Sequence, residues 1–193
     1  MPLLKLEHSP FEYRADFIVY GLLCMLLAGL LVVDAPVGEG WRLMAWVLAG
    51  AAGWTLLEYL LHRFVLHALP PFKGWHAEHH RRPNALVALP TLMTVTLFAT
   101  LIGLPAAWLL GTWPATALSL GLAGGYLSYG LIHHATHHGF GRWPSRQSWL
   151  AQRRRWHAMH HRRPPGSPHA AGSSAFYGVS NGFWDRVFGT GRR

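Results

Sequence analysis

Four apolar stretches constrain this chain of 193 residues more than any other feature. They cover about residues 17–33, 41–61, 86–110 and 113–132. A helix needs about 20 mainly apolar residues to cross a bilayer, and a crossing segment must satisfy its own backbone hydrogen bonds. We therefore predict an all-α integral membrane bundle of about four transmembrane helices, in a single domain over residues 1–193. Pro90 and Pro105 are expected to kink or end the third helix.

The basic residues indicate how the chain crosses the membrane. The chain has 17 lysines and arginines against 8 acidic residues, a formal net charge of +9. If the N-terminus is cytoplasmic, only Arg42 lies on the far side, and the other 16 of the 17 lie on the cytoplasmic side. The positive-inside rule thus predicts a multi-pass protein with both termini in the cytoplasm. The run of arginines from Arg153 to Arg155 then sets topology and touches anionic lipid, and no nucleic-acid partner is expected.

Ten of the 14 histidines fall into four short groups. The groups read His62-x4-His67, His76-x2-His79-His80, His133-x3-His137 and His157-x2-His160-His161. Imidazole is a common ligand of Fe, Cu, Ni and Zn, and ten imidazoles are too many for one ion. In the predicted topology all four groups face the cytoplasm. We therefore predict a two-metal centre in a cytoplasmic, histidine-rich helical cap that includes residues 133–193.

The spacing within the groups suggests which histidines meet. Residues three and four apart share one face of a helix, so the three histidines of each His-x2-His-His group are expected to converge. His133 and His137 lie one turn apart, and so do His134 and His138, so spacing alone leaves that pair open. His62 and His67 are separated by about 140° on an ideal helix and are expected to bind different metals.

Glu58 is an acidic residue inside the second apolar stretch. An ionisable side chain is costly in a membrane and is usually functional there. Because Glu58 precedes His62 by one turn, we expect its carboxylate to accept the free imidazole N–H of His62 and so to orient that ligand. A hydrogen bond to another helix is the alternative.

These motifs together resemble the fatty acid hydroxylase superfamily, which also includes sterol desaturases and carotene hydroxylases. The first two groups, preceded by Glu58-Tyr-Leu-Leu, are typical of that superfamily. The segment Gly125-Tyr-Leu-Ser-Tyr-Gly-Leu-Ile-His133-His-Ala-Thr-His137-His138 is similar to the fatty acid 2-hydroxylase branch. So are Trp156-His157-Ala-Met-His160-His161, Tyr177-Gly-Val-Ser and Phe183-Trp-Asp-Arg-Val-Phe-Gly-Thr190.

The resemblance implies a helical, membrane-embedded, two-metal oxygenase. It carries the ligand role to His62, His67, His76, His79, His80, His133, His137, His157, His160 and His161. It thus favours His133 and His137 over the neighbouring pair. Gly130 departs from the family, which has Asp there, so any role of that Asp is absent or supplied elsewhere. No cytochrome b5-like domain is evident, so electrons are expected from a separate cytochrome b5-, ferredoxin- or reductase-like protein.

We interpret the chain as a di-iron, O2-dependent hydroxylase of lipid biosynthesis. The expected substrate is a fatty acyl chain from the bilayer, hydroxylated at the carbon next to the carbonyl. Ten imidazoles would also bind zinc. One alternative is a sterol or carotenoid hydroxylase or desaturase of the same superfamily. A non-enzymatic alternative is a membrane zinc-binding or metal-transport protein, but transport predicts ligands along a path across the bilayer, whereas all four groups lie on one side.

Overall fold

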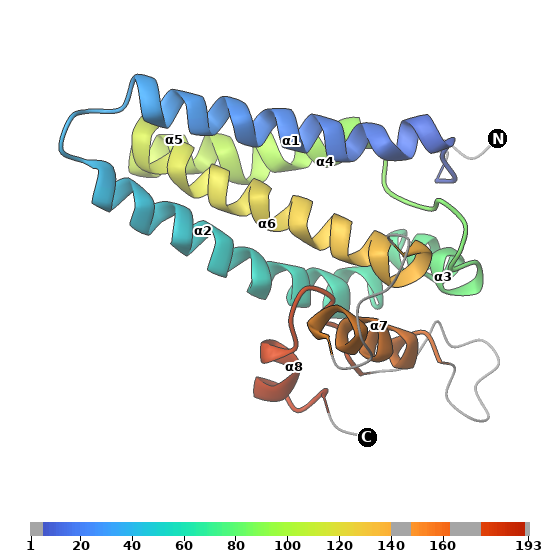
Figure 1. The fold of residues 1–193 in the computed structure, drawn as a ribbon. Helices are drawn as coiled ribbons and strands as arrows, with labels where there is room; N and C mark the ends of the chain where they lie inside the picture. The colour runs from blue at the N-terminus through green and yellow to red at the C-terminus, as the bar shows by residue number, and fades with distance from the viewer. Residues whose placement is uncertain (1–5, 140–147, 163–174, 192–193) are drawn as a thin grey trace. The chain divides into compact units, whose positions relative to one another are not determined.

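The computed structural model describes residues 6–139, 148–162 and 175–191, and their regular elements are all helical, as predicted. Figure 1 shows these elements in chain order. The α-helices are α1 (Pro10–Val33), α2 (Gly40–Leu60), α3 (Phe72–Arg81), α4 (Thr91–Phe98), α5 (Leu104–Leu110), α6 (Thr112–His138), α7 (Trp149–His160) and α8 (Phe183–Val187). Two π-helical turns, η1 (Leu61–Leu66) and η2 (Ala99–Gly103), continue α2 and α4.

Four helical segments are long and apolar enough to cross a membrane, which confirms the predicted number. They are Pro10–Val33, Gly40–Leu66, Thr91–Leu110 and Thr112–His138. The first begins earlier than predicted because Ser9 caps it. The Ser9 hydroxyl accepts the Glu12 N–H at 3.2 Å, and the Glu12 carboxylate accepts the Ser9 N–H at 2.7 Å. The side of the membrane on which the helix ends lie stays a prediction.

The two prolines of the third segment act differently. Pro90 precedes the first residue of α4, so the helix starts there rather than near residue 86. Pro105 is accommodated within the segment, directly after the η2 turn. A proline ring clashes with the carbonyl four residues earlier in an α-helix, and a wider π-turn is one way in which a helix adapts to such a break.

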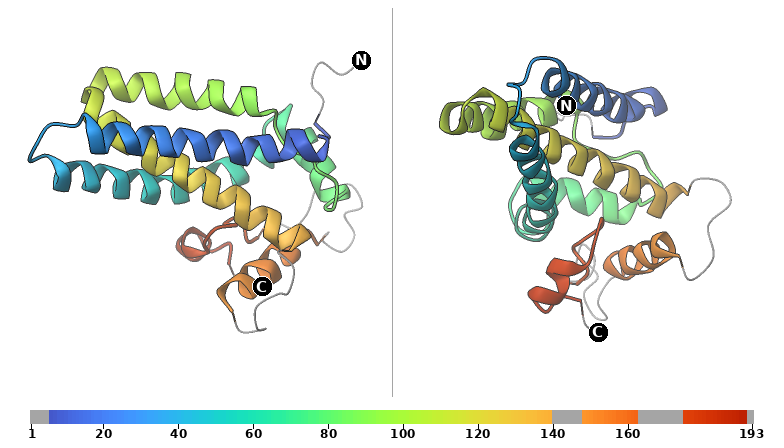
Figure 2. Two further views of the ribbon diagram at one scale, coloured as in Figure 1. Left: turned by 45° about the horizontal axis from the view of Figure 1, so that its top comes forward. Right: turned by 60° about the vertical axis from the view of Figure 1, so that its left-hand side comes forward.

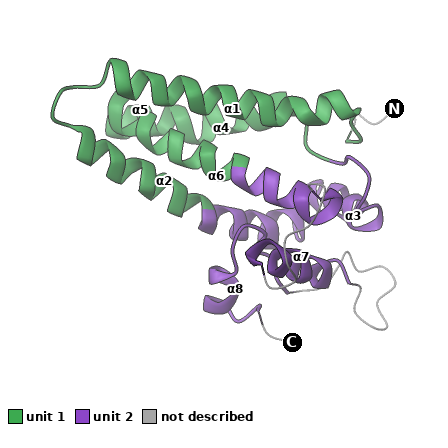
Figure 3. Cartoon of the chain, viewed as in Figure 1, with its two compact units in different colours: residues 1–54, 88–127 green, residues 55–87, 128–193 purple. Residues whose placement is uncertain are grey.

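The chain divides into two compact units, shown in Figure 3. Unit 1 contains Met1–Trp54 and Ala88–Leu127, and unit 2 contains Thr55–Val87 and Ser128–Arg193. Helices α2 and α6 therefore contribute their first parts to unit 1 and their last parts to unit 2. The expectation from the sequence was one domain over residues 1–193. Unit 2 contains every described histidine of the four groups.

Unit 1 is a bundle of apolar helices, in which α1 lies beside α4 (Figure 2). Glycines let α2 and α6 approach closely: a Cβ on Gly121 would lie 2.0 Å from the Val47 carbonyl oxygen. One polar contact joins α1 to α6, where the Tyr126 hydroxyl donates to the Asp16 carboxylate at 2.9 Å. This unit supplies apolar surface for a bilayer, whereas the chemistry-bearing residues gather in unit 2.

Candidate metal centre

All ten histidines of the four groups lie at helix ends or on short helices of unit 2. His62 is in the η1 turn and His67 directly follows it. α3 carries His76, His79 and His80, and the last turns of α6 carry His133 and His137. α7 carries His157 and His160, and His161 directly follows it. Segments separated by up to about half of the chain are thus brought together, as the sequence predicted for a shared site.

The ten side chains form two groups of five, in each of which the potential ligand nitrogens lie within 4.8 Å of one another. The first histidine group comprises His62, His67, His76, His80 and His160. The second histidine group comprises His79, His133, His137, His157 and His161. The groups are adjacent, since the rings of His80 and His161 stack with centroids 4.2 Å apart. Two neighbouring ions, each with five imidazole donors, fit this arrangement.

The two His-x2-His-His motifs are shared between the groups, which corrects the expectation that each would converge on one point. On α3, His76 and His80 join the first group, whereas His79 joins the second. At the end of α7, His157 and His161 join the second group and His160 joins the first. Each group therefore receives a helix-end pair, an i,i+4 pair and one histidine from the opposite motif. The physical reason is the angular position of the side chains on a helix. Residue i+4 is rotated from residue i by about 40° in one direction, whereas residue i+3 is rotated by about 60° in the opposite direction, toward the other group.

His62 and His67 meet in one group, so the expectation that they would serve different metals was wrong. Their ring centroids lie 5.2 Å apart. The expectation assumed an ideal α-helix, but residues 61–66 form a π-helical turn, in which hydrogen bonds join residues five apart. A spacing of five residues places two side chains on different faces of an α-helix. In the π-helical turn the same spacing places both imidazole rings on one face.

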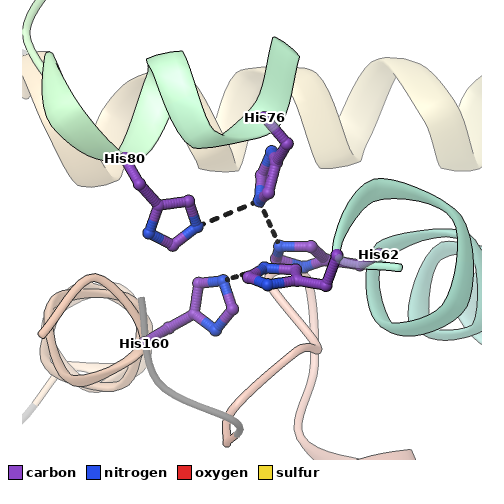
Figure 4. A group of neighbouring side chains, drawn as sticks. His62, His76, His80 and His160 are labelled. Atoms are coloured by element: carbon purple, nitrogen blue, oxygen red, sulfur yellow. Dashed lines mark hydrogen bonds between the residues drawn. The ribbon is translucent and has the colours of Figure 1, made fainter. Parts of the chain in front are cut away.

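The imidazole Nε2 atoms point into the groups. In the first group, the Nε2 atom of His76 lies 3.0 Å from the Nε2 atoms of His62 and His80. In the second group, Nε2 of His137 lies 2.7 Å from Nε2 of His157. Figure 4 shows the rings of the first group turned toward a common centre. Two nitrogens that bind one ion at about 2.05 Å and at right angles would be about 2.9 Å apart, so these spacings suit a shared metal.

The outer nitrogens of two histidines in the first group are held by backbone carbonyls. His62 Nδ1–H donates to the Tyr177 carbonyl at 2.6 Å, and His160 Nδ1–H donates to the Ala175 carbonyl at 2.8 Å. A neutral imidazole that donates through Nδ1 presents the Nε2 lone pair, which is the atom that a metal needs. These two carbonyls therefore set both the ring orientation and the tautomer.

Burial keeps the histidines neutral. Burial, together with repulsion from neighbouring histidines, lowers the pKa of His79 and of His160 to about 4 and that of His67 to about 3. Neutral imidazole is the form that coordinates a metal. His79 is 6% exposed, and neither ring nitrogen has a hydrogen-bond partner among the described residues. A buried polar group without a partner is costly, and a metal in the second group would satisfy it.

Glu58 does not contact His62, so the predicted hydrogen bond between them was wrong. Its Oε1 atom accepts the N–H groups of Val179 at 2.6 Å and Ser180 at 2.9 Å, and Oε2 accepts the Ser180 hydroxyl. His62 donates to the Tyr177 carbonyl instead. The Glu58 carboxylate thus holds the segment that orients His62 and does not contact the His62 ring. Its three donors come from residues 179 and 180, which are far from Glu58 in the sequence and could not be identified from neighbouring residues.

Asp185 is a second buried carboxylate that sequence reasoning missed. It is 1% exposed, and it accepts the N–H groups of Tyr177 and Gly178, each at 2.8 Å. Together with Glu58 it binds four successive backbone N–H groups of residues 177–180, which we name the clamp loop. One signal in the sequence could have identified it. Asp185 lies in the segment Phe183-Trp-Asp-Arg, which is similar to the fatty acid 2-hydroxylase branch, but no role was assigned to this aspartate.

Comparison with known proteins agrees with this geometry. The family model described as fatty acid hydroxylase matches residues 47–190. The chain belongs to the fatty acid hydroxylase family. This confirms the resemblance inferred from the histidine motifs and their flanks.

Several fatty acid hydroxylases are similar over most of this chain. A dihydroceramide fatty acyl 2-hydroxylase of Arabidopsis thaliana is 34% identical over 161 residues, which cover 75% of this chain and 59% of that protein. A ceramide very long chain fatty acid hydroxylase of Schizosaccharomyces pombe is 32% identical, covering 74% and 41%. The fatty acid 2-hydroxylase of Homo sapiens is 28% identical, covering 74% and 38%. The matched part is therefore less than two thirds of each relative's length.

The fold is also found in a solved fatty acid hydroxylase structure. Full-length scs7p, of which only the hydroxylase domain is visible, aligns with a TM-score of 0.74 and 23% identity. The alignment covers 97% of this chain and 68% of that one. The described helices therefore follow the arrangement of a known hydroxylase domain.

His134 and His138 stay outside both histidine groups. They lie next to His133 and His137 on α6 and stack on each other with centroids 4.7 Å apart. The family resemblance favoured His133 and His137, and the structure places these two in the second group. The neighbouring pair thus offers matched control positions on the same helix.

Proposed function

We propose that this protein is an O2-dependent monooxygenase that hydroxylates a lipid acyl chain, with two metal ions held by the ten histidines. The observation that carries the proposal is the pair of adjacent five-histidine groups with inward Nε2 atoms. The named activities of the similar proteins, fatty acid and fatty acyl 2-hydroxylation, support an acyl substrate over a sterol or carotenoid.

Iron is the metal that we propose for both groups. Structural zinc is bound tetrahedrally by four ligands. Each group here offers five imidazole donors. Five donors favour an ion with a higher coordination number. When bound, the metals would supply the activation of O2 and the oxidation of an unactivated C–H bond, which no amino-acid side chain supplies.

In this proposal the residues of the chain hold the metals and orient the histidine rings. The clamp loop fixes His62, and the Ala175 carbonyl fixes His160. Tyr177, which is 6% exposed, covers the first group with its ring 5.3 Å from the ring of His67 and limits the access of water. In the overall reaction one oxygen atom of O2 enters a C–H bond next to the acyl carbonyl. The other leaves as water, with two electrons and two protons from a separate electron-transfer protein.

The predicted topology places this chemistry in the cytoplasm. We propose that both termini and the histidine groups face that side, as the distribution of 16 of 17 basic residues favours. An acyl substrate would then enter from the bilayer, and a soluble or membrane-bound electron donor would approach from the cytoplasm.

Isotope labelling tests the proposed reaction. Protein purified without oxygen, loaded with iron and placed in lipid nanodiscs is given a reduced electron-transfer protein and 18O2, and the lipids are analysed by mass spectrometry. We expect one 18O atom in an acyl chain at the carbon next to the carbonyl. His133→Ala should abolish incorporation, whereas His134→Ala, one residue away on α6, should retain it. Iron-loaded protein that leaves every lipid unlabelled would overturn the proposal.

A further inference from the structure

Part of α2 must lie at the depth of the hydrocarbon core wherever the membrane is placed along it. The candidate span Gly40–Leu66 has 27 residues, and a bilayer core needs about 20. Even a short spanning segment of about 17 residues within 40–66 always contains residues 50–56. Thr55 is therefore inside the core in every placement, and Glu58 and Tyr59 lie within about one helical turn of it.

The C-terminal segment of the chain contacts these same three residues. The Trp184 indole N–H donates to the Thr55 hydroxyl at 2.9 Å, and Glu58 accepts the N–H groups of the clamp loop. The Tyr59 hydroxyl lies 3.1 Å from the Thr190 hydroxyl, and its ring stacks on Phe188 with centroids 5.2 Å apart. Residues 177–190 thus lie beside the membrane-depth part of α2.

Many backbone N–H groups of this segment donate to acceptors within the protein. Irregular backbone survives at membrane depth only where its polar groups find partners. Glu58 and Asp185 accept the four N–H groups of the clamp loop, and the Phe176 N–H donates to the Thr190 carbonyl. The N–H groups of Thr190 and Gly191 donate to the Asp185 carbonyl. This arrangement also explains why a carboxylate stands inside an apolar span.

The outer face of the segment is apolar. Phe183, Val187 and Phe188 are 56%, 55% and 47% exposed, although large apolar side chains favour burial. Leu61 and Phe64, at the end of the same span, are exposed as well. Exposed apolar side chains are therefore found both on the C-terminal segment and on the last turns of the span within unit 2.

We propose that the C-terminal segment Phe176–Thr190 is a re-entrant membrane element whose α8 face contacts the acyl chains of the bilayer leaflet nearest the histidine groups. Phe183, Val187 and Phe188 lie in hydrocarbon. Arg186, which is exposed on the same short helix, extends its long side chain toward the head groups. The clamp loop that orients His62 is then anchored in the membrane from which an acyl chain arrives.

Site-directed fluorescence tests this proposal without any need for metal or turnover, so its outcome is independent of the proposed hydroxylase activity. In a Cys24→Ser background, single cysteines replace Val187, Leu48 or Lys73 and carry an environment-sensitive dye. Leu48 is 62% exposed within the span and serves as the lipid control. Lys73, on α3, is exposed outside the spans and serves as the aqueous control.

We expect the Val187 dye to behave like the Leu48 dye in lipid vesicles: blue-shifted emission, loss of most fluorescence to an acyl-chain spin label, and protection from aqueous iodide. The Lys73 dye should show the reverse pattern. A Val187 dye that iodide quenches as it does the Lys73 dye would overturn the proposal, and so would one protected from both quenchers, since a protein would then cover it. If the Val187 variant fails to fold, Phe183→Cys gives the same reading.

Discussion

Replacement of Glu58 tests how the clamp loop supports the first histidine group. The Glu58 carboxylate accepts two backbone N–H groups and one hydroxyl, all from residues 179 and 180. Glu58→Leu removes every acceptor and leaves the two N–H groups buried without partners. Glu58→Gln keeps one amide oxygen in the place of Oε1 and loses the charge.

The magnitudes follow from the number of bonds lost. A buried donor left without a partner costs about 1–3 kcal/mol, so Glu58→Leu should lower the free energy of unfolding by about 2–6 kcal/mol. Bonds to a neutral acceptor are weaker by about 1 kcal/mol or less than bonds to a charged one, so Glu58→Gln should cost about 1–2 kcal/mol. Because Tyr177 would lose its position, the first group should lose metal before the second does.

Denaturant or thermal unfolding in detergent, with metal analysis of the same preparation, measures both effects. Glu39→Leu is the control: Glu39 pairs with Arg42 at 3.0 Å in an exposed position, and its loss should cost less than about 1 kcal/mol. If Glu58→Leu unfolds like Glu39→Leu and keeps all its metal, the clamp loop does not depend on Glu58 and the reasoning fails.

Two further predictions concern packing and topology. Gly178→Ala would place a Cβ 2.0 Å from the Asn181 carbonyl oxygen and should lower the free energy of unfolding by about 1–3 kcal/mol. Gly74→Ala, with no atom within 4 Å of the added Cβ, should unfold like the wild type. Equal stability of the two variants would contradict the close packing of the clamp loop at Gly178. In a cysteine-free background, labels on cysteines at Gly74 and Ala158 should report the cytoplasmic side and one at Val37 the opposite side. Labelling of Gly74 and Ala158 from opposite sides would refute the topology.

The sequence predicted the helical membrane fold and the gathering of the histidines because both depend on local patterns. Long apolar runs determine spanning helices, and spacings of three and four place side chains on one face. The assignment of each histidine to a group was not predictable in this way. His79 and His160 cross to the opposite groups because of how α3 and α7 face each other, and His62 joins His67 through a π-turn that spacing alone did not indicate.

The role of Glu58 shows the limit most clearly. Its cost inside an apolar span correctly marked it as a residue with a polar partner. The nearest candidate in the sequence was His62, one turn away, but the actual partners lie more than 120 residues further along the chain. The role of Asp185 was not predicted because a single acidic residue on a short helix forms no motif with its sequence neighbours. Such contacts are set by tertiary packing, which only the structure supplies.

Counting metal ions in three proteins tests the central claim most directly. Wild type, His76→Ala and His79→Ala are purified without oxygen, loaded with iron and analysed for iron per chain. His76 belongs to the first group and His79 to the second, although both are on α3. We predict about two ions in the wild type and about one in each variant, with different spectroscopic signatures for the ion that remains. One ion or none in the wild type, or two ions in both variants, would contradict the two-metal account.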